Sequence, residues 1–360
     1  MQTLRISPSK IQQGEIEKIV KKLREGAVIC LPTDTVYGLA VDAWNEKAAI
    51  KIYNLKKRTK EKPLILFIKD QRHLISLVKK IPLSAIKMIN KWWPGPLTLI
   101  FKSAISDPWY LVNQKGGIGI RIPSHPVVNK ILQENGLSLA TTSANLSGEQ
   151  SIKDIEELSP IIKEKIDLIV DSGKIPPGKE STVIDVTIFP PRMLREGEIK
   201  REEITKITQK PAGILFVCTG NSCRSVMAEG FFKKYWPKKQ NKVEIKSAGT
   251  SVRFPSSSSS YTVQVMKERG IDVSSYQSKR VNQNLIDDSD IILVMEEVHL
   301  YYLKRTFPEA ENKIWMLKEF TSNRKERIPD PIGTSKAYYE KVADEIEGEI
   351  KKLIGKLSDN

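Results

Sequence analysis

The chain has 360 residues, of which 40% are hydrophobic and 28% charged, and its formal net charge at pH 7 is +15. This length is enough for two or three domains with separate cores, and the composition is that of a globular protein. No stretch approaches the roughly 20 consecutive apolar residues of a membrane helix, and the N-terminal segment lacks the apolar core of a secretory signal. We therefore expect a cytoplasmic protein with no membrane partner.

Cysteine and histidine are too sparse for a disulfide framework or a zinc-type spacing, so no metal site is predicted. The chain has three of each: Cys30, Cys218 and Cys223, and His73, His125 and His299. The positive net charge is typical of a protein with an anionic partner such as a nucleotide or RNA, but also of a lysine-rich surface.

Helix and strand signals alternate along the chain, which is the pattern of an α/β protein. Near the N-terminus four apolar residues recur at helical spacing, namely Ile16, Ile19, Val20 and Leu23. Gly26 is placed to end that helix, and residues 27–31 (AVICL) follow as a short apolar strand.

A second cycle of strand and helix begins late in the chain. The segment 196–210 is charged and poorly apolar, and the apolar strand 214–217 (ILFV) follows it. We predict a first domain over 1–205, a linker over 206–212 and a second domain over 213–360. The second domain closes with an amphipathic helix whose apolar face consists of Val342, Ile346, Ile350, Leu353 and Leu357.

Four segments of the first domain suit a polar, phosphorylated ligand, although each has an ordinary explanation. Residues 32–39 (PTDTVYGL) and 141–148 (TTSANLSG) place hydroxyls after apolar strands, as a capped turn also would. Residues 56–64 (KKRTKEKPL) could neutralise a triphosphate or form a solvated charge run. Residues 116–123 (GGIGIRIP) let backbone approach a ligand closely, without a Walker pattern.

Together and in this order, with 93–98 (WPGPLT), 181–183 (STV) and 194–197 (LREG), these segments resemble the YrdC-type threonylcarbamoyl-AMP synthase family over about residues 8–200. The resemblance implies a twisted α/β domain with an open basic cavity. It also implies a reaction: L-threonine, bicarbonate and ATP give threonylcarbamoyl-AMP and pyrophosphate. The product supplies the t6A modification of adenosine 37 in tRNA through downstream threonylcarbamoyl-transfer machinery. Mg²⁺ is expected with ATP, but no protein ligand for it is identified.

The same resemblance implies two groups of contacts. The threonine side consists of Thr35, Arg121, Thr141 and Ser181. The ATP side consists of Lys56, Arg58, Lys62, Ser143, Asn145, Ser151 and Arg195. A carbamate oxygen of threonine would attack the α-phosphate, so no protein nucleophile is needed, and catalysis would come from positioning and charge stabilisation. Longer members of the family carry a different C-terminal domain whose linker closes over the site, and that domain is replaced here.

Residues 218–225 (CTGNSCRS) of the second domain lie between an apolar strand and a predicted helix. Backbone N–H groups of such a loop and the helix N-terminus surround a phosphate and lower the pKa of a thiol. We predict Cys218 as nucleophile, Arg224 as phosphate ligand and Ser225 as donor to the thiolate. Asp330, in 327–331 (RIPDP), is the candidate general acid.

With 247–250 (SAGT) and the strand 291–295, this loop resembles the low-molecular-weight protein phosphatase family over about residues 213–357. The resemblance implies a four-stranded parallel sheet flanked by helices, and the same roles for Cys218, Arg224 and Asp330. Phosphorylated proteins would be the substrates. The phosphate loop also contains Thr219, Gly220, Asn221, Ser222 and Cys223.

Substrate choice depends on two positions. Tyrosine-specific relatives typically carry an aliphatic residue in place of Ser222 and aromatic residues after the Asp-Pro pair, where this chain has Ile332. The pattern is similar to that of bacterial protein-arginine phosphatases, which have threonine at the Ser222 position. We predict phosphoarginine as substrate, with phosphotyrosine as the alternative. A coupled arsenate reductase would need cysteines after Cys223, and none follows.

Two further alternatives stay open at this point. Cys223 is either a core residue or a partner that protects Cys218 by forming a disulfide. The first domain is either a synthase or a non-catalytic module that binds double-stranded RNA or a nucleotide. Intact motifs in both halves favour a bifunctional enzyme.

Overall fold

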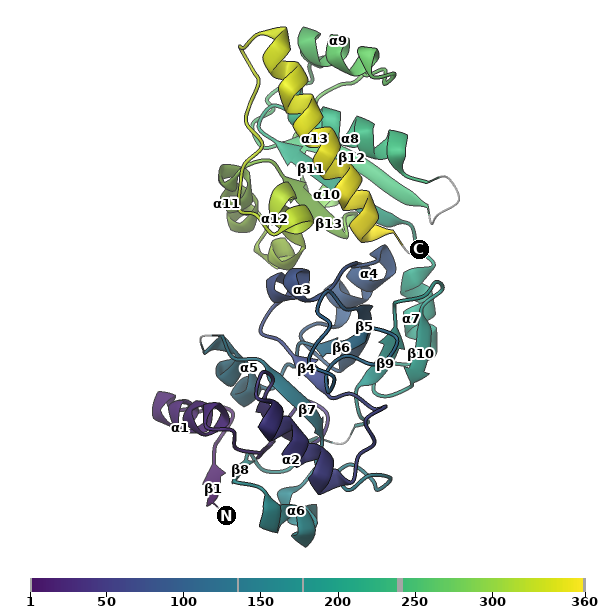
Figure 1. Cartoon of the computed structure of the whole chain (residues 1–360). Helices are drawn as coiled ribbons and strands as arrows, with labels where there is room; N and C mark the ends of the chain where they lie inside the picture. The colour runs from purple at the N-terminus through teal and green to yellow at the C-terminus, as the bar shows by residue number, and fades with distance from the viewer. Residues whose placement is uncertain (1, 135, 177, 238–241, 359–360) are drawn as a thin grey trace. The chain divides into compact units, whose positions relative to one another are not determined.

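The computed structural model describes residues 2–134, 136–176, 178–237 and 242–358 (Figure 1). The chain divides into two compact units. The first contains the residues up to Lys79 and Lys91–Ile207, and the second contains Lys80–Asn90 and the chain from Thr208 onward. Most of helix α4 (Leu83–Trp92) thus groups with the second unit. The segment 206–212 contains the end of α7 (Arg201–Thr208) and the first residue of β11 (Ala212–Cys218).

The first unit is built on one mixed sheet of ten strands in the order β1-β8-β2-β3-β7-β4-β6-β5-β9-β10. The strands are β1 (Gln2–Arg5), β2 (Ile29–Leu31), β3 (Gly38–Asp42), β4 (Ile65–Phe67), β5 (Leu97–Lys102), β6 (Gly117–Arg121), β7 (Leu139–Ser143), β8 (Leu168–Asp171), β9 (Thr182–Asp185) and β10 (Arg192–Arg195). β7 lies near the middle and pairs antiparallel with both β3 and β4. Loops from distant parts of the chain therefore meet beside this strand.

Besides α7, the described residues of this unit form six helices. They are α1 (Gln13–Arg24), α2 (Glu46–Lys56), α3 (Gln71–Leu77), α5 (Pro126–Gln133), the short 3₁₀ helix η1 (Ile155–Glu157) and α6 (Pro160–Lys165). The predicted first helix is confirmed as α1, and its four apolar residues are buried. They pack with Val128 and Ile131 of α5 and with Leu139 of β7 in one core. Gly26 ends the turn at a φ of +83°, which favours glycine.

The second unit has a four-stranded parallel sheet in the order β12-β11-β13-β14. Its strands besides β11 are β12 (Val243–Gly249), β13 (Ile291–Val294) and β14 (Ile314–Met316). Every residue of β11 is buried, as expected for a central parallel strand covered on both faces. Leu215 and Val217 of β11 share a core with Leu303 of helix α11.

Helices flank this sheet. They are α8 (Arg224–Tyr235), α9 (Ser260–Glu268), α10 (Gln283–Asp287), α11 (Glu297–Thr306), the 3₁₀ helix η2 (Pro308–Lys313), α12 (Leu317–Ser322) and α13 (Lys336–Leu357). α13 is the predicted terminal helix, and its five predicted apolar residues are all buried. It packs against α8, α9 and α12. Both predicted architectures are thus confirmed. No helix in the described part of the chain combines the length and apolar character needed to cross a bilayer.

Gly197 lies in the turn after β10, where the backbone packs closely against residues 180–182. A Cβ atom there would lie 2.0 Å from the carbonyl oxygen of Glu180 and 2.6 Å from the carbonyl carbon of Ser181. We expect Gly197→Ala to destabilise the first unit by at least about 1–3 kcal/mol, because the backbone must shift. Urea unfolding measures the loss.

Gly14→Ala in α1 is the matched control. A Cβ at Gly14 would meet nothing within 4 Å, so the same substitution gains helix propensity and costs nothing in packing. An unchanged unfolding midpoint for Gly197→Ala would contradict the tight approach.

Candidate active sites

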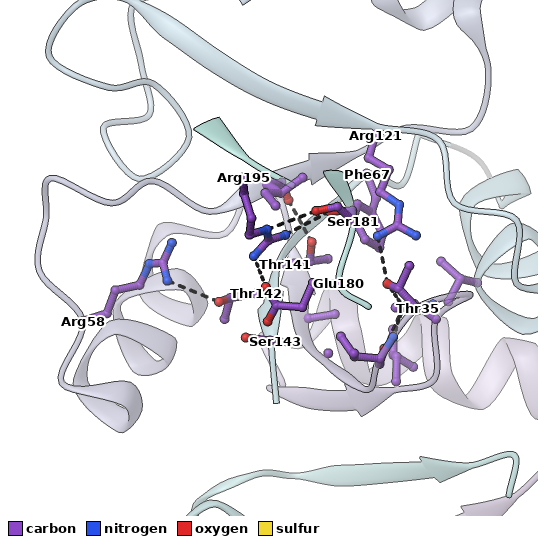
Figure 2. A pocket seen from close by; sticks show the side chains of 17 residues that line it. Thr35, Arg58, Phe67, Arg121, Thr141, Thr142, Ser143, Glu180, Ser181 and Arg195 are labelled. Atoms are coloured by element: carbon purple, nitrogen blue, oxygen red, sulfur yellow. Dashed lines mark hydrogen bonds and ion pairs between the residues drawn. The ribbon is translucent and has the colours of Figure 1, made fainter. Parts of the chain in front are cut away.

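The first unit contains a cavity of about 140 Å³ beside the ends of the central strands (Figure 2). All four predicted threonine contacts line it, together with three of the predicted ATP contacts, Arg58, Ser143 and Arg195. The rest of the lining includes an apolar wall made of Leu31, Val36, Ile65, Phe67 and Val128. The cavity thus combines three arginines, several hydroxyls and one apolar side.

Arg121, at the end of β6, is the most deeply placed cation of the cavity and is only 3% exposed. Its Nη2 lies 2.8 Å from Oδ1 of Asp34, its Nη1 donates to Thr35 Oγ1 at 3.1 Å, and its Nε donates to the carbonyl of Gly95 at 2.9 Å. Burial lowers the pKa of Arg121, and the Asp34 carboxylate opposes that shift. The guanidinium is therefore fixed in place before a ligand arrives.

The loop after β2 holds Thr35 rigidly. The hydroxyl of Thr33 accepts from the backbone N–H groups of Thr35 and Val36 and donates to the carbonyl of Val36 at 2.6 Å. A local turn of this kind is common for threonine in loops. It aims the Thr35 hydroxyl at Arg121, as Figure 2 shows.

Ser181 and Arg195 were predicted for different substrates, but they form one network. Arg195 donates from Nε to the carbonyl of Ser181 at 3.0 Å and from Nη2 to its hydroxyl at 3.1 Å. Arg195 also forms an ion pair with Glu180, which accepts a hydrogen bond from Ser151. Ser181, Arg195 and the unpredicted carboxylate of Glu180 line the cavity together, and Ser151 joins their network from outside the lining.

Arg58 reaches the cavity from the basic loop after α2. Its Nε donates to the carbonyl of Lys62 at 2.7 Å, and its Nη1 donates to Thr142 Oγ1 at 3.3 Å. Lys62 itself is exposed and does not line the cavity, so its carbonyl rather than its ammonium joins this network.

Lys56 and Asn145 lie behind the cavity wall. Lys56, 3% exposed, donates to the carbonyl of Ser143 and to Oδ1 of Asn145. Burial, with the charge of Arg58, lowers the pKa of Lys56 to about 8. Asn145 in turn donates to the carbonyls of Leu146 and Glu149. In the free protein the hydrogen bonds of these two residues stabilise the loop after β7.

In the second unit, the loop 218–225 connects β11 to α8 as predicted. Cys218 Sγ lies 3.0 Å from Ser225 Oγ. Asn221 adopts a left-handed backbone with φ +50° and donates from Nδ2 to Ser225 at 2.9 Å and to Ser247 at 3.0 Å. Its Oδ1 accepts from the backbone N–H of Lys279. These hydrogen bonds hold the loop in a curved conformation at the N-terminus of α8, where backbone N–H groups can bind an anion.

The pKa of Cys218 departs from the prediction. Burial raises the pKa of this thiol, and the net direction is upward. The Ser225 hydroxyl, the charge of Arg224 and the backbone N–H groups of Ser225 and Asn221 all act to lower it. The predicted groups are therefore in place around the sulfur, but in the free protein desolvation outweighs them.

Arg224 is almost fully buried and has two carboxylate partners. Its Nη1 forms an ion pair with Glu296, and its Nη2 lies 2.6 Å from Oδ2 of Asp330. It also donates to the carbonyl of Ile328 at 3.0 Å. The fold thus brings the three predicted catalytic residues together.

The remaining loop residues have distinct surroundings. Ser222 is half-buried, and a Cβ at Gly220 would lie 3.5 Å from its hydroxyl. Thr219 Oγ1 lies 2.9 Å from Nε2 of His299. Cys223 is buried, with its Sγ 3.4 Å from Ser259 Oγ and 3.5 Å from the hydroxyl of Tyr339, and all three cysteines are free.

Sequence reasoning missed four polar residues of the two sites: Asp34, Glu180, Glu296 and His299. Asp34 lies within the segment 32–39, which was predicted to bind a polar ligand. Glu296 directly follows a predicted strand, where catalytic groups gather in α/β folds. Either signal could have identified them. Glu180 follows the sequence 173–179 (GKIPPGK), which has no periodicity, and His299 resembles an ordinary residue of a helix.

Comparison with known proteins assigns each unit to a family. Residues 21–197 match the Sua5/YciO/YrdC family model, described as telomere recombination, and residues 213–360 match the model described as low molecular weight phosphotyrosine protein phosphatase. The chain is 35% identical to the threonylcarbamoyl-AMP synthase of Pyrococcus abyssi over 55% of its own length and 58% of that protein. It is 35% identical to the putative threonylcarbamoyl-AMP synthase of Methanocaldococcus jannaschii over 53% of its length and 89% of that protein.

Among solved structures, the arginine phosphatase YwlE of Geobacillus stearothermophilus is 36% identical, with a TM-score of 0.38, over 40% of this chain and 91% of that one. The two family models define the chain as a fusion of a Sua5/YciO/YrdC domain with a low-molecular-weight phosphatase domain. The chain belongs to the Sua5/YciO/YrdC family through its first unit and to the low-molecular-weight phosphatase family through its second. It spans 58% of the length of the Pyrococcus relative.

His299 gives the second unit a defined pH dependence. Burial and the charge of Arg224 lower the pKa of His299 to about 4, against about 6.5 for an unperturbed histidine. Between these values the unfolded chain binds a proton that the folded unit does not. We therefore expect the contribution of His299 to the stability of this unit to be complete above pH 6.5 and to fall as the pH drops towards 4, by on the order of 3 kcal/mol.

Hydrogen exchange of the β11 and β13 amides measures this loss of stability, and these amides report on the second unit alone. His299→Gln should flatten that part of the pH dependence, whereas His73→Gln in the first unit should leave it intact. An equal slope in the unaltered chain and His299→Gln would disprove the assignment.

Proposed function

We propose that the first unit synthesises threonylcarbamoyl-AMP from L-threonine, bicarbonate and ATP. The observation that carries the proposal is a cavity lined by all four predicted threonine contacts and by three of the seven predicted nucleotide contacts. Arg121 would hold the threonine carboxylate, and the apolar wall at Ile65 and Phe67 would take its methyl group. Arg58 and Arg195 would hold the phosphates. Relatives of this unit carry the name of the same synthase.

The chemistry then needs positioning and charge rather than a protein nucleophile. The threonine amine forms an N–C bond with CO₂ derived from bicarbonate and loses a proton, which gives a carbamate. A carbamate oxygen attacks the α-phosphorus, and the bond to the β-phosphate oxygen breaks to release pyrophosphate. ATP would enter as its magnesium complex. Fixed guanidinium groups favour the charge that develops on the phosphates. The product would pass to the machinery that modifies adenosine in tRNA.

Arg58→Ala should reduce threonine-dependent pyrophosphate release at least about a hundredfold, as expected when one preorganised donor to a charged transition state is lost. Arg192→Ala, at an exposed arginine of β10, is the matched control and should leave the rate unchanged. Threonine-dependent release that survives in Arg58→Ala would remove this residue from the reaction.

We propose that the second unit hydrolyses phosphorylated protein side chains through a phosphocysteine. Support comes from the convergence of Cys218, Arg224 and Asp330 around one loop. Cys218 sulfur forms a bond to phosphorus as the bond to the substrate atom breaks, and Asp330 gives that leaving atom a proton. Water then attacks the phosphorus and gives a proton to Asp330, while the S–P bond breaks to release phosphate and the Cys218 thiolate. Arg224 holds the phosphate oxygens in both steps.

We propose phosphoarginine as the preferred substrate. Ser222 offers a half-buried hydroxyl in the loop that begins at the nucleophile, suited to hydrogen-bond with a guanidinium. Ile332, which is 58% exposed, presents no ring to stack on phosphotyrosine. Phosphotyrosine is the second candidate, and the description of the matching family model favours it.

Initial rates on phosphoarginine and phosphotyrosine protein, with Cys218→Ser as the blank, separate the two candidates. We expect a preference for phosphoarginine of at least about tenfold, since a polar site rejects a ligand that leaves its hydroxyl unpaired. Ser222→Ile should shift the preference towards phosphotyrosine, while Ser256→Ala in the surface loop should not. A preference for phosphotyrosine in the unaltered chain would reject the phosphoarginine assignment.

A further inference from the structure

We infer that Glu180 is the protein's ligand for the divalent cation that accompanies the triphosphate in the first unit. The inference rests on the proposed adenylation and adds to it the protein group that recognises the metal complex of ATP.

Glu180 is the one acidic residue among the described residues that line the cavity. Figure 2 shows it on the side where Arg195, Thr142 and Ser143 lie, away from Thr35. Its Oε2 pairs with Arg195 and its Oε1 accepts from Ser151, both of which belong to the predicted ATP side. The carboxylate therefore lies where the phosphates would bind.

A carboxylate is unfavourable in a receptor for a bare triphosphate, because like charges repel at short range and more strongly in a cavity than in water. A divalent cation reverses the sign of this interaction, since it can bind the carboxylate and the phosphates at once. Proteins commonly bind Mg²⁺ in this way, through one or two carboxylates together with substrate phosphates. A single acid is thus sufficient when the nucleotide supplies the other charged ligands.

The donor set around Glu180 fits a hard cation. The Ser151 hydroxyl touches the carboxylate, and the hydroxyls of Thr142 and Ser143 line the same cavity. These are oxygen donors of the kind that Mg²⁺ prefers, and the side chain of Glu180 is 29% exposed, which leaves it accessible. The ion pair with Arg195 stabilises both groups until the nucleotide complex arrives.

An alternative role is purely positional: Glu180 would orient Arg195 and Ser151 and bind no metal. The two roles differ in their metal dependence. A metal ligand matters only when the cation is present, whereas a positioning carboxylate supports nucleotide binding equally with and without it.

The test is calorimetric binding of an ATP analogue with a methylene group between the α- and β-phosphorus atoms, in Mg²⁺ and in EDTA at equal ionic strength. We expect the unaltered chain to bind at least about tenfold more tightly with Mg²⁺. Glu180→Gln should lose most of this factor and should bind in EDTA at least as tightly as the unaltered chain, because the repulsion is gone. Glu198→Gln is the matched control, because Glu198 is exposed, lies nearby and does not line the cavity.

Two results overturn the inference while the proposed function stands. One is an unchanged Mg²⁺ factor in Glu180→Gln. The other is an equal loss of affinity in Mg²⁺ and in EDTA, which assigns Glu180 a positional role. If the unaltered chain binds the analogue under neither condition, the proposed adenylation fails, and the assignment of Glu180 fails with it.

Discussion

Guanidinium groups that internal carboxylates hold in place before any anion arrives are the feature that the two sites share. A buried charge without a partner is costly, so each arginine needs a compensating group in the free protein. Arg121 has Asp34, Arg195 has Glu180, and Arg224 has both Glu296 and Asp330. Each pair fixes the position of a cation, and Arg121 and Arg224 are also buried, which is the state in which a guanidinium interacts most strongly with a phosphate or a carboxylate.

The sheets supply the rigidity behind these pairs. Arg121 and Arg195 end strands β6 and β10, and Arg224 opens helix α8 directly after the loop that follows β11. The neighbouring strands are tied together by ladders of backbone hydrogen bonds, so the ends of distant segments meet at fixed positions. Short loops then need only a few side-chain bonds, such as those of Thr33 and Asn221, to fix the functional groups.

The sequence predicts those elements and residues whose signal is contained in the local sequence pattern. Helix α1, strand β11 and helix α13 have strong apolar periodicity or a continuous apolar run, and all three were predicted with the correct buried residues. The phosphate loop was readable because its residues are adjacent in the chain.

Other features depend on tertiary contacts that no local pattern records. Glu180 reaches the first site only because β9 pairs with β10 and brings Arg195 beside it. Lys62 was predicted as an ATP contact because its cation stands in a basic run. In the structure its carbonyl accepts a hydrogen bond from Arg58, and its side chain does not line the cavity. The pKa of Cys218 was predicted from its neighbours alone, and burial reversed the net direction.

In the proposed phosphatase reaction, the ion pair between Arg224 and Asp330 makes phosphate binding in the second unit an exchange reaction. An incoming oxyanion competes with an internal carboxylate for the same guanidinium, so part of its binding energy is used to release Asp330. The release places a free carboxyl group next to the newly bound phosphate ester, where a proton donor is required. Occupancy of the loop and availability of the acid are thus linked through one side chain, and the empty loop keeps its acid engaged.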